Sequence, residues 1–216
     1  MKYTHLFFDM DGTLIDSKPG IFNSIYYTLR KLQLPESEWP VDLNPFIGPP
    51  LRESFRSLFG FSSEMAEHAT KTYREYYSAK GMHEYNVYPG IPEVLRQLTE
   101  AGFRLSLVTS KAEVFAKEII KNTTFAALFQ TVSGCEISGE RSGKHELISY
   151  TLNKLGLQPS KQILMIGDRL HDIKGARLAG ISSAAVLYGY GSYEELTNEK
   201  PILLINTPEE LLTSLL

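Results

Sequence analysis

A short apolar segment that ends in two acidic residues most constrains the fold of this 216-residue chain. Residues 3–8 form a largely apolar run, and Asp9 and Asp11 follow it at once, with Gly12 and Thr13 next. Such a run, bounded by turn residues, is typical of a buried strand in a parallel sheet. Two carboxylates this close repel each other unless a cation holds them together. The pattern predicts a strand that ends at a site for a divalent metal; the simpler alternative is a turn with solvated aspartates.

Strand and helix patterns alternate along the chain from residue 88 onward. The expected strands are 103–108, 130–133, 163–166, 184–187 and 202–205. The expected helices are 92–101, a segment around 114–120, 142–155, 170–179 and a short one from 208. Repeated strand–helix units imply right-handed crossovers and a mostly parallel sheet covered on both faces. The sequence therefore predicts an α/β fold with a Rossmann-like parallel sheet as its core.

No strand pattern occurs between residues 18 and 85, where the apolar residues instead follow a helical period. One helical face begins after Pro19 and repeats through Ile21, Ile25 and Leu29, and two further helical patterns follow Leu51. We therefore expect a small all-helical cap domain over residues 17–85. The core domain would comprise residues 1–16 and 86–216.

Composition limits the kinds of binding partner and the cellular compartment that we expect for this protein. The net charge is −3 and no basic run occurs, so nucleic acid is not an expected partner. Cys135 is the only cysteine, which leaves no internal disulfide and fits a reducing, cytoplasmic compartment. The sequence shows neither a signal peptide nor an apolar run long enough to span a bilayer. We expect a soluble cytoplasmic protein with no membrane partner, as a monomer or a homodimer.

Polar residues gather where the predicted strands end, and ligands bind beyond the carboxyl ends of the strands in open parallel sheets. This set comprises Asp9, Asp11, Thr109, Ser110, Asp168 and Asp172, with Lys144 at the start of a helix on the same edge. Each has a simpler interpretation: Thr109 and Ser110 as helix caps, Asp172 as a first-turn acid, and Lys144 as a solvated surface lysine. Asp16 suits a helix cap as well as it suits the site.

Four motifs in this order resemble the haloacid dehalogenase superfamily, in its phosphatase branch with a small helical cap. They are residues 9–14, the strand that ends in Thr109, then Lys144, and finally residues 167–172. The linking segments 46–51 and 88–90 also resemble the family. His145 follows Lys144 where many relatives have proline, and the sequence assigns no role to His145 or to His171.

The resemblance implies a role for each motif. Asp9 would be the nucleophile, and Asp11 would protonate the leaving oxygen and then deprotonate water. Thr109, Ser110 and Lys144 would bind the phosphoryl oxygens. The cofactor would be Mg²⁺, held by Asp9, the Asp11 main-chain carbonyl and Asp168, with Asp172 acting through water or by orienting its neighbours.

The implied activity is a Mg²⁺-dependent phosphatase that acts on a small phosphorylated metabolite through an aspartyl-phosphate. The sequence is most similar to phosphoglycolate phosphatases and 5′-nucleotidases. Alternatives are a phosphosugar mutase of the β-phosphoglucomutase type, a pyrophosphatase, and a non-catalytic phosphate-binding regulatory protein. Asp11 disfavours dehalogenation, because the dehalogenases of the superfamily lack this second acid. In the cap, Gly48 and Arg52 are candidate substrate residues, although Arg52 fits an ordinary exposed arginine equally well.

Overall fold

The computed structural model describes residues 2–138 and 140–216. Its internal contacts divide the chain into two units. The first comprises the residues up to Asp16 together with Val87–Leu216, and the second is Ser17–Asn86. Within the described chain, no helix is both long enough and apolar enough to cross a membrane.

Six parallel strands form the sheet of the first unit, in the order β5-β4-β1-β6-β7-β8. Central β1 (His5–Phe8) lies between β4 (Arg104–Ala112) and β6 (Ile163–Gly167). The remaining strands are β5 (Phe129–Cys135), β7 (Ser182–Val186) and β8 (Leu203–Ile205). Every residue of β1 is buried, as expected for a central strand covered on both faces. The predicted α/β fold with a parallel sheet is confirmed.

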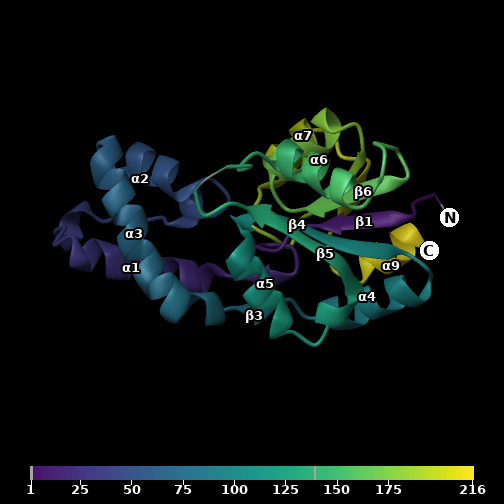
Figure 1. The fold of residues 1–216 in the computed structure, drawn as a ribbon, viewed down its shortest axis with the longest axis horizontal. Helices are drawn as coiled ribbons and strands as arrows, with labels where there is room; N and C mark the ends of the chain where they lie inside the picture. The colour runs from purple at the N-terminus through teal and green to yellow at the C-terminus, as the bar shows by residue number, and fades with distance from the viewer. Residues whose placement is uncertain (1, 139) are drawn as a thin grey trace. The chain divides into compact units, whose positions relative to one another are not determined.

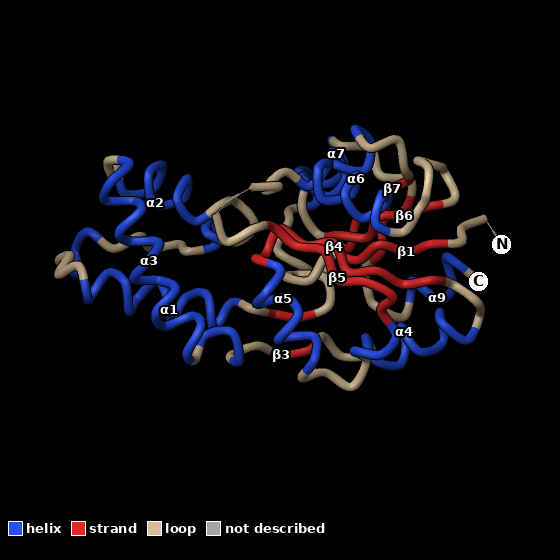
Figure 2. The backbone as a smooth tube through the Cα atoms, in the orientation of Figure 1, coloured by secondary structure: helices blue, strands red, loops and turns tan. Residues whose placement is uncertain are grey.

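Helices cover both faces of this sheet (Figures 1 and 2). On one face, α6 (Lys144–Lys154) and α7 (Leu170–Leu178) pack against each other and against the central strands. The other face carries α4 (Ile91–Glu100), α5 (Glu113–Lys121) and α9 (Glu210–Leu215). A buried cluster that includes Phe7, Val108, Leu147 and Met165 fills the space under α6. This packing holds the first residue of α6 above the end of β1.

The three central strands reach the same edge of the sheet together. Phe8 of β1 is paired in register with Leu107 of β4 and with Ile166 of β6. The chain passes from β1 to β4 and β5 on one side, and then crosses to β6 on the other. Strand order therefore reverses at β1, which is where open α/β sheets bind their ligands.

The second unit is built from helices. It contains α1 (Lys18–Lys31), α2 (Leu51–Phe59) and α3 (Ser63–Ala79), with short 3₁₀ turns at Glu36–Glu38, Asn44–Phe46 and Gly81–His83. Helix α3 packs against both α1 and α2. Four phenylalanines pack against one another around α2, namely Phe46, Phe55, Phe59 and Phe61. Residues 18–85, all of which the structure describes, contain no strand, as the sequence predicts.

The differences from the predicted elements are local. Strand β4 continues to Ala112 instead of ending at Val108, with a shift of register against β5 between these two residues. Two-residue strands β2 (Ile15–Asp16) and β3 (Asn86–Val87) pair as a small separate sheet. Strands of two residues carry no periodicity that a sequence could reveal. Helix α8 (Tyr193–Asn198) was also missed, although Ser192 caps it by accepting a hydrogen bond from the Glu195 N–H.

Candidate active site

Asp9 follows the last residue of β1 and is 8% exposed. Its main-chain N–H donates to the carbonyl oxygen of Ile166 at 2.9 Å, which ties it to β6. Its Oδ1 lies 2.8 Å from the ammonium of Lys144. Burial raises the pKa of Asp9 above its ordinary value, although the charge of Lys144 opposes this shift. The sequence thus places a buried carboxylate at the point where strand order reverses.

Lys144 is the first residue of α6 and is 6% exposed. Its Nζ pairs with Oδ1 of Asp9 and, at 2.7 Å, with Oδ1 of Asp172, and it donates to the carbonyl oxygen of Val108 at 3.1 Å. Burial by itself would lower the pKa of Lys144, but Asp172 and Asp9 raise it above its usual value. The interpretation of Lys144 as a solvated surface lysine is wrong.

Asp168 and Asp172 come from the end of β6 and the first turn of α7, and both are fully buried. Asp168 accepts the Tyr190 N–H at 2.8 Å and the Thr13 hydroxyl at 3.4 Å. Asp172 accepts the Arg169 N–H at 3.1 Å, as a first-turn acid does. It also pairs with Lys144, so Asp172 is both a capping acid of α7 and a member of the candidate site.

A cation suits the three buried carboxylates. Asp9, Asp168 and Asp172 each offer one oxygen, and these oxygens lie within 4.8 Å of one another. Burial raises the pKa of Asp168 well above its ordinary value, and the charges of Asp172 and Asp9 add to the effect. Lys144 supplies one positive charge against three carboxylates. Such an undercompensated set of hard oxygen donors fits a divalent ion.

Glycines make the close approach to Asp168 feasible. Gly12 has φ +77°, and a Cβ there would lie 2.0 Å from Oδ2 of Asp168. A Cβ on Gly189 would lie 2.3 Å from the Cβ of Asp168. No larger residue fits at Gly12, since both its conformation and its surroundings require glycine.

Lys111 is a residue of this edge that the sequence analysis missed. Its Nζ lies 3.0 Å from Oδ2 of Asp11, and its side chain is 7% exposed. The other carboxylate oxygen of Asp11, Oδ1, is buried and has no hydrogen-bond partner among the described residues. The only available signal was its position two residues after Thr109, and basic residues are too common in such segments for that position to be informative.

Thr109 and Ser110 lie within the irregular part of β4. Thr109 is 1% exposed, and its Oγ1 accepts the Lys111 N–H at 3.2 Å. Helix α5 begins only at Glu113, and its N-cap residue Ala112 has no side-chain capping bond. The alternative that Thr109 and Ser110 cap the next helix is therefore wrong. Their predicted phosphate-binding role remains a prediction.

Two predicted substrate residues belong to the second unit. Gly48 is exposed with φ +108°, just before α2. Arg52 in the first turn of α2 forms an ion pair with Glu67 of α3, and its side chain is 53% exposed. Their role in substrate binding stays a prediction.

The remaining candidates lie around these residues. Asp16 accepts a hydrogen bond from the hydroxyl of Tyr190 at 2.9 Å, and the N-cap position of α1 belongs to Ser17. His145 and His171 are both exposed. Asp16, the last residue of β2, is thus linked through Tyr190 to Asp168, which accepts the Tyr190 N–H.

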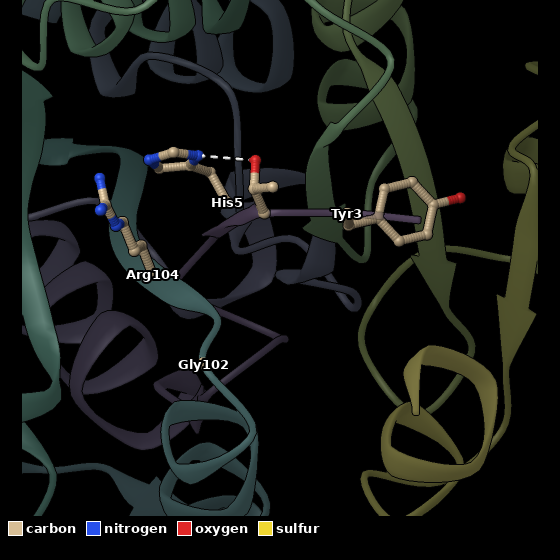
Figure 3. A pocket seen from close by; sticks show the side chains of 5 residues that line it. Tyr3, His5, Gly102 and Arg104 are labelled. Atoms are coloured by element: carbon tan, nitrogen blue, oxygen red, sulfur yellow. Dashed lines mark hydrogen bonds between the residues drawn. The ribbon is translucent and has the colours of Figure 1, made fainter. Parts of the chain in front are cut away.

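A separate hollow of about 340 Å³ lies where β1 and β4 begin (Figure 3). It is lined by Tyr3, Thr4, His5, Gly102 and Arg104. His5 and Arg104 are paired at the start of their strands, at the opposite end from Asp9 and Thr109. None of these five described residues is acidic, so the hollow does not offer the donor set found at the carboxyl edge.

Comparisons with known proteins give matches that include the same motifs. Residues 6–186 match the family described as haloacid dehalogenase-like hydrolase. A 5′-nucleotidase of Pseudomonas aeruginosa is 40% identical over 93% of this chain and 90% of that protein. A phosphoglycolate phosphatase of Aquifex aeolicus is 30% identical over 95% of this chain and 93% of that protein.

Other similar proteins differ in name. The tyrosine-protein kinase PtkA of Mycobacterium tuberculosis is 36% identical over 85% of this chain, which spans 62% of the kinase. Among solved structures, a predicted phosphatase from Clostridium acetobutylicum has a TM-score of 0.91 and is 39% identical, covering 99% of this chain and 98% of that one. The similarity therefore extends over both the strand-end motifs and the helical segment.

Proposed function

This chain belongs to the haloacid dehalogenase-like hydrolases, and we propose that it hydrolyses a small phosphate monoester through an aspartyl-phosphate on Asp9, with Mg²⁺ as cofactor. The matched residues 6–186 include all four motifs that suggested the family. The prediction of an enzyme of this family, similar to 5′-nucleotidases and phosphoglycolate phosphatases, is confirmed. One observation carries the proposal: the buried Asp9 carboxylate shares Lys144 with a second carboxylate at the switch point of the sheet.

The reaction would proceed in two displacements. A carboxylate oxygen of Asp9 attacks phosphorus, and the bond from phosphorus to the ester oxygen breaks. Asp11 gives its proton to the departing alcohol. Asp11 then takes a proton from water, which attacks phosphorus and breaks the bond to Asp9, releasing inorganic phosphate. Two displacements replace one more difficult step, and the enzyme ends as it began.

Cations and donors around Asp9 would stabilise the charge of the transferring group. Lys144 is fixed by three contacts, so its ammonium needs no reorganisation when the phosphoryl group arrives. Thr109 and the Ser110 N–H would donate to the phosphoryl oxygens. Asp9, Asp168 and the Asp11 carbonyl would hold Mg²⁺, and Asp172 would orient Lys144 beside it. When bound, Mg²⁺ supplies positive charge to the phosphoryl oxygens.

We propose phosphoglycolate or a nucleoside 5′-monophosphate as the substrate, by analogy with the named relatives. Residues 17–86 would act as a cap that excludes water and selects the substrate, with Gly48 and Arg52 among its contacts. A phosphosugar mutase and a pyrophosphatase use the same core chemistry, so they remain alternatives. A non-catalytic phosphate-binding protein is disfavoured, because it would not need the full set of nucleophile, acid and metal carboxylates.

The test is phosphate release by the purified protein, with Mg²⁺ and with EDTA. The substrates are phosphoglycolate, adenosine 5′-monophosphate, glucose 1-phosphate and pyrophosphate. We expect release that requires Mg²⁺ and falls at least about 1000-fold in Asp9→Asn, which lacks the nucleophile. Acid quenching of the wild-type protein should trap a phosphoryl group on the peptide that contains Asp9.

Glu118→Gln is the matched control, because it removes an exposed carboxylate charge on α5 that pairs with Lys121 and accepts a hydrogen bond from Asn122. It should retain wild-type activity. Release that persists in Asp9→Asn would contradict the covalent route. A well-folded wild-type protein that releases phosphate from none of the compounds would contradict the phosphatase itself.

A further inference from the structure

Lys111 is a second lysine at the carboxyl edge of the sheet whose side chain is largely covered, and the proposed chemistry gives it no role. Its side chain is 7% exposed and that of its partner Asp11 is 17% exposed, with 3.0 Å between Nζ and Oδ2. Its main-chain N–H is bound to Oγ1 of Thr109. The lysine is thus held in place beside two predicted site residues.

The two lysines serve different sides of the reaction. Lys144 pairs with Asp9 and Asp172, on the side of the nucleophile. Lys111 pairs with Asp11, the group that would meet the leaving oxygen. Lys111 would therefore lie near the groups that the leaving alcohol carries next to its oxygen.

The contact between Lys111 and Asp11 is open to exchange. Asp11 is held through Oδ2, while its buried Oδ1 has no hydrogen-bond partner among the described residues. When Asp11 turns toward the leaving oxygen, Lys111 loses this carboxylate contact. An ammonium with little access to water is stabilised by an opposite charge, so an anionic group on the substrate would be favoured where the Asp11 carboxylate had been.

We propose that Lys111 binds a second anionic group on the leaving-group side, so that this enzyme prefers phosphate esters whose alcohol carries a carboxylate or a further phosphate. This inference rests on the proposed function and narrows its substrate class. Phosphoglycolate has a carboxylate one carbon from the ester oxygen. Adenosine 5′-monophosphate has only neutral groups there, and it should be the poorer substrate.

A pair of esters with one difference isolates the contact. Phosphoglycolate carries a carboxylate where 2-hydroxyethyl phosphate carries a neutral alcohol. If Lys111 also holds Asp11 in place, losing that support lowers kcat/KM for both esters by the same factor. The ratio of the two kcat/KM values therefore reports only the contact of Lys111 with the second anion. We expect this ratio to fall roughly 10- to 100-fold in Lys111→Met, the usual range for a lost charge-assisted hydrogen bond. Lys111→Arg should restore most of it.

Lys117→Met is the control, because it removes an exposed lysine from the adjacent helix α5. It should leave the ratio unchanged. An equal loss for both esters in Lys111→Met would overturn the inference, because Lys111 would then only position Asp11. A wild-type protein that hydrolyses adenosine 5′-monophosphate as efficiently as phosphoglycolate would also overturn it.

Binding separates this inference from the proposed function. The Asp9→Asn protein should bind phosphoglycolate more tightly than 2-hydroxyethyl phosphate in calorimetry, whether or not the wild-type protein turns either over. Adding Lys111→Met should remove most of that difference. Equal affinity for the two esters in Asp9→Asn would overturn the role of Lys111, whereas absent turnover with selective binding would overturn only the phosphatase.

Discussion

The carboxyl edge of the sheet and the helical unit Ser17–Asn86 bury polar groups in opposite ways. In the helical unit, buried hydroxyls such as those of Thr28 and Thr70 donate to the carbonyl four residues earlier in their own helix. At the sheet edge, Lys144 meets Asp9, which lies 135 residues away in the sequence. The first kind of burial is satisfied locally, while the second depends on the whole fold.

The difference separates stability from function. A hydroxyl that bonds its own helix costs little, and it leaves the helix free to pack through its apolar residues. A buried cluster of charges is a poor source of stability, because well-packed apolar residues of similar volume are often as stable or more so. Its presence at the strand ends therefore points to chemistry. Substitutions in the two regions should separate activity from stability.

The largest combined effect on stability and activity is expected for Lys144→Met. Loss of the ammonium leaves Asp9 and Asp172 uncompensated, so the free energy of unfolding should fall by about 3–5 kcal/mol. Phosphatase activity of the folded fraction should fall at least about 100- to 1000-fold, because a preorganised donor to the transition state is lost. Denaturant titration and steady-state kinetics measure the two effects.

Lys154→Met provides the control for that substitution, since Lys154 is exposed on the same helix α6. Its activity and stability should be close to those of the wild type. Activity of Lys144→Met within about tenfold of the wild type would contradict the role of this lysine in transition-state stabilisation.

Phe55→Ala should affect stability alone. Phe55 is fully buried, meets Phe46 edge to face and stacks with Phe61, so its removal should cost about 3–5 kcal/mol of unfolding free energy. At a temperature where the variant is folded, kcat should change little. Leu58→Ala on the same helix, at a side chain that is 38% exposed, should change stability by less than about 1 kcal/mol. A large fall in kcat of folded Phe55→Ala would contradict the expectation that this residue affects stability alone.

Asp168→Asn should stabilise the metal-free protein. Burial and neighbouring carboxylates raise the pKa of Asp168 in the folded protein. Its ionisation therefore opposes folding once the pH exceeds the pKa that Asp168 has in the unfolded chain. The advantage of the asparagine variant should therefore grow from acidic to alkaline pH in EDTA. With Mg²⁺ at 100 times its Kd, the wild type should gain about 2.7 kcal/mol and the variant much less. Equal responses to Mg²⁺ would place the metal elsewhere.

The core of the site could be predicted from the sequence because each motif follows a buried strand. Asp9 and Asp168 stand directly after apolar runs, and parallel strands bring such residues to one edge. Lys144 was harder, because the helix pattern alone fits a surface lysine equally well. The order of the four motifs decided between the two interpretations, and the structure buries the residue.

Other features depended on geometry that no periodicity reveals. Strand β4 continues through an irregular segment to Ala112, and this segment carries Lys111 to Asp11. A bulge shifts side chains between faces, so the direction of Lys111 could not be read from the alternation of residues. The Tyr190 N–H bond to Asp168 depends on a turn far along the chain.

The smallest effect on stability is expected for substitution of Arg52. This substitution tests directly whether the helical unit contributes to function as the sheet edge is proposed to do. Arg52 pairs with Glu67, and both side chains are largely or partly exposed, so either Arg52→Ala or Glu67→Gln should change the unfolding free energy by less than about 1 kcal/mol. The two variants should differ in kinetics if Arg52 binds a second anionic group. Arg52→Ala should then raise KM for phosphoglycolate, while Glu67→Gln, which removes the competing carboxylate, should leave KM unchanged or lower it.

Identical KM values in both variants would confine Arg52 to a surface ion pair, and the helical unit would keep its purely packing role at this position. Opposite shifts would mean that an exposed pair in the helical unit contributes to recognition without contributing to stability.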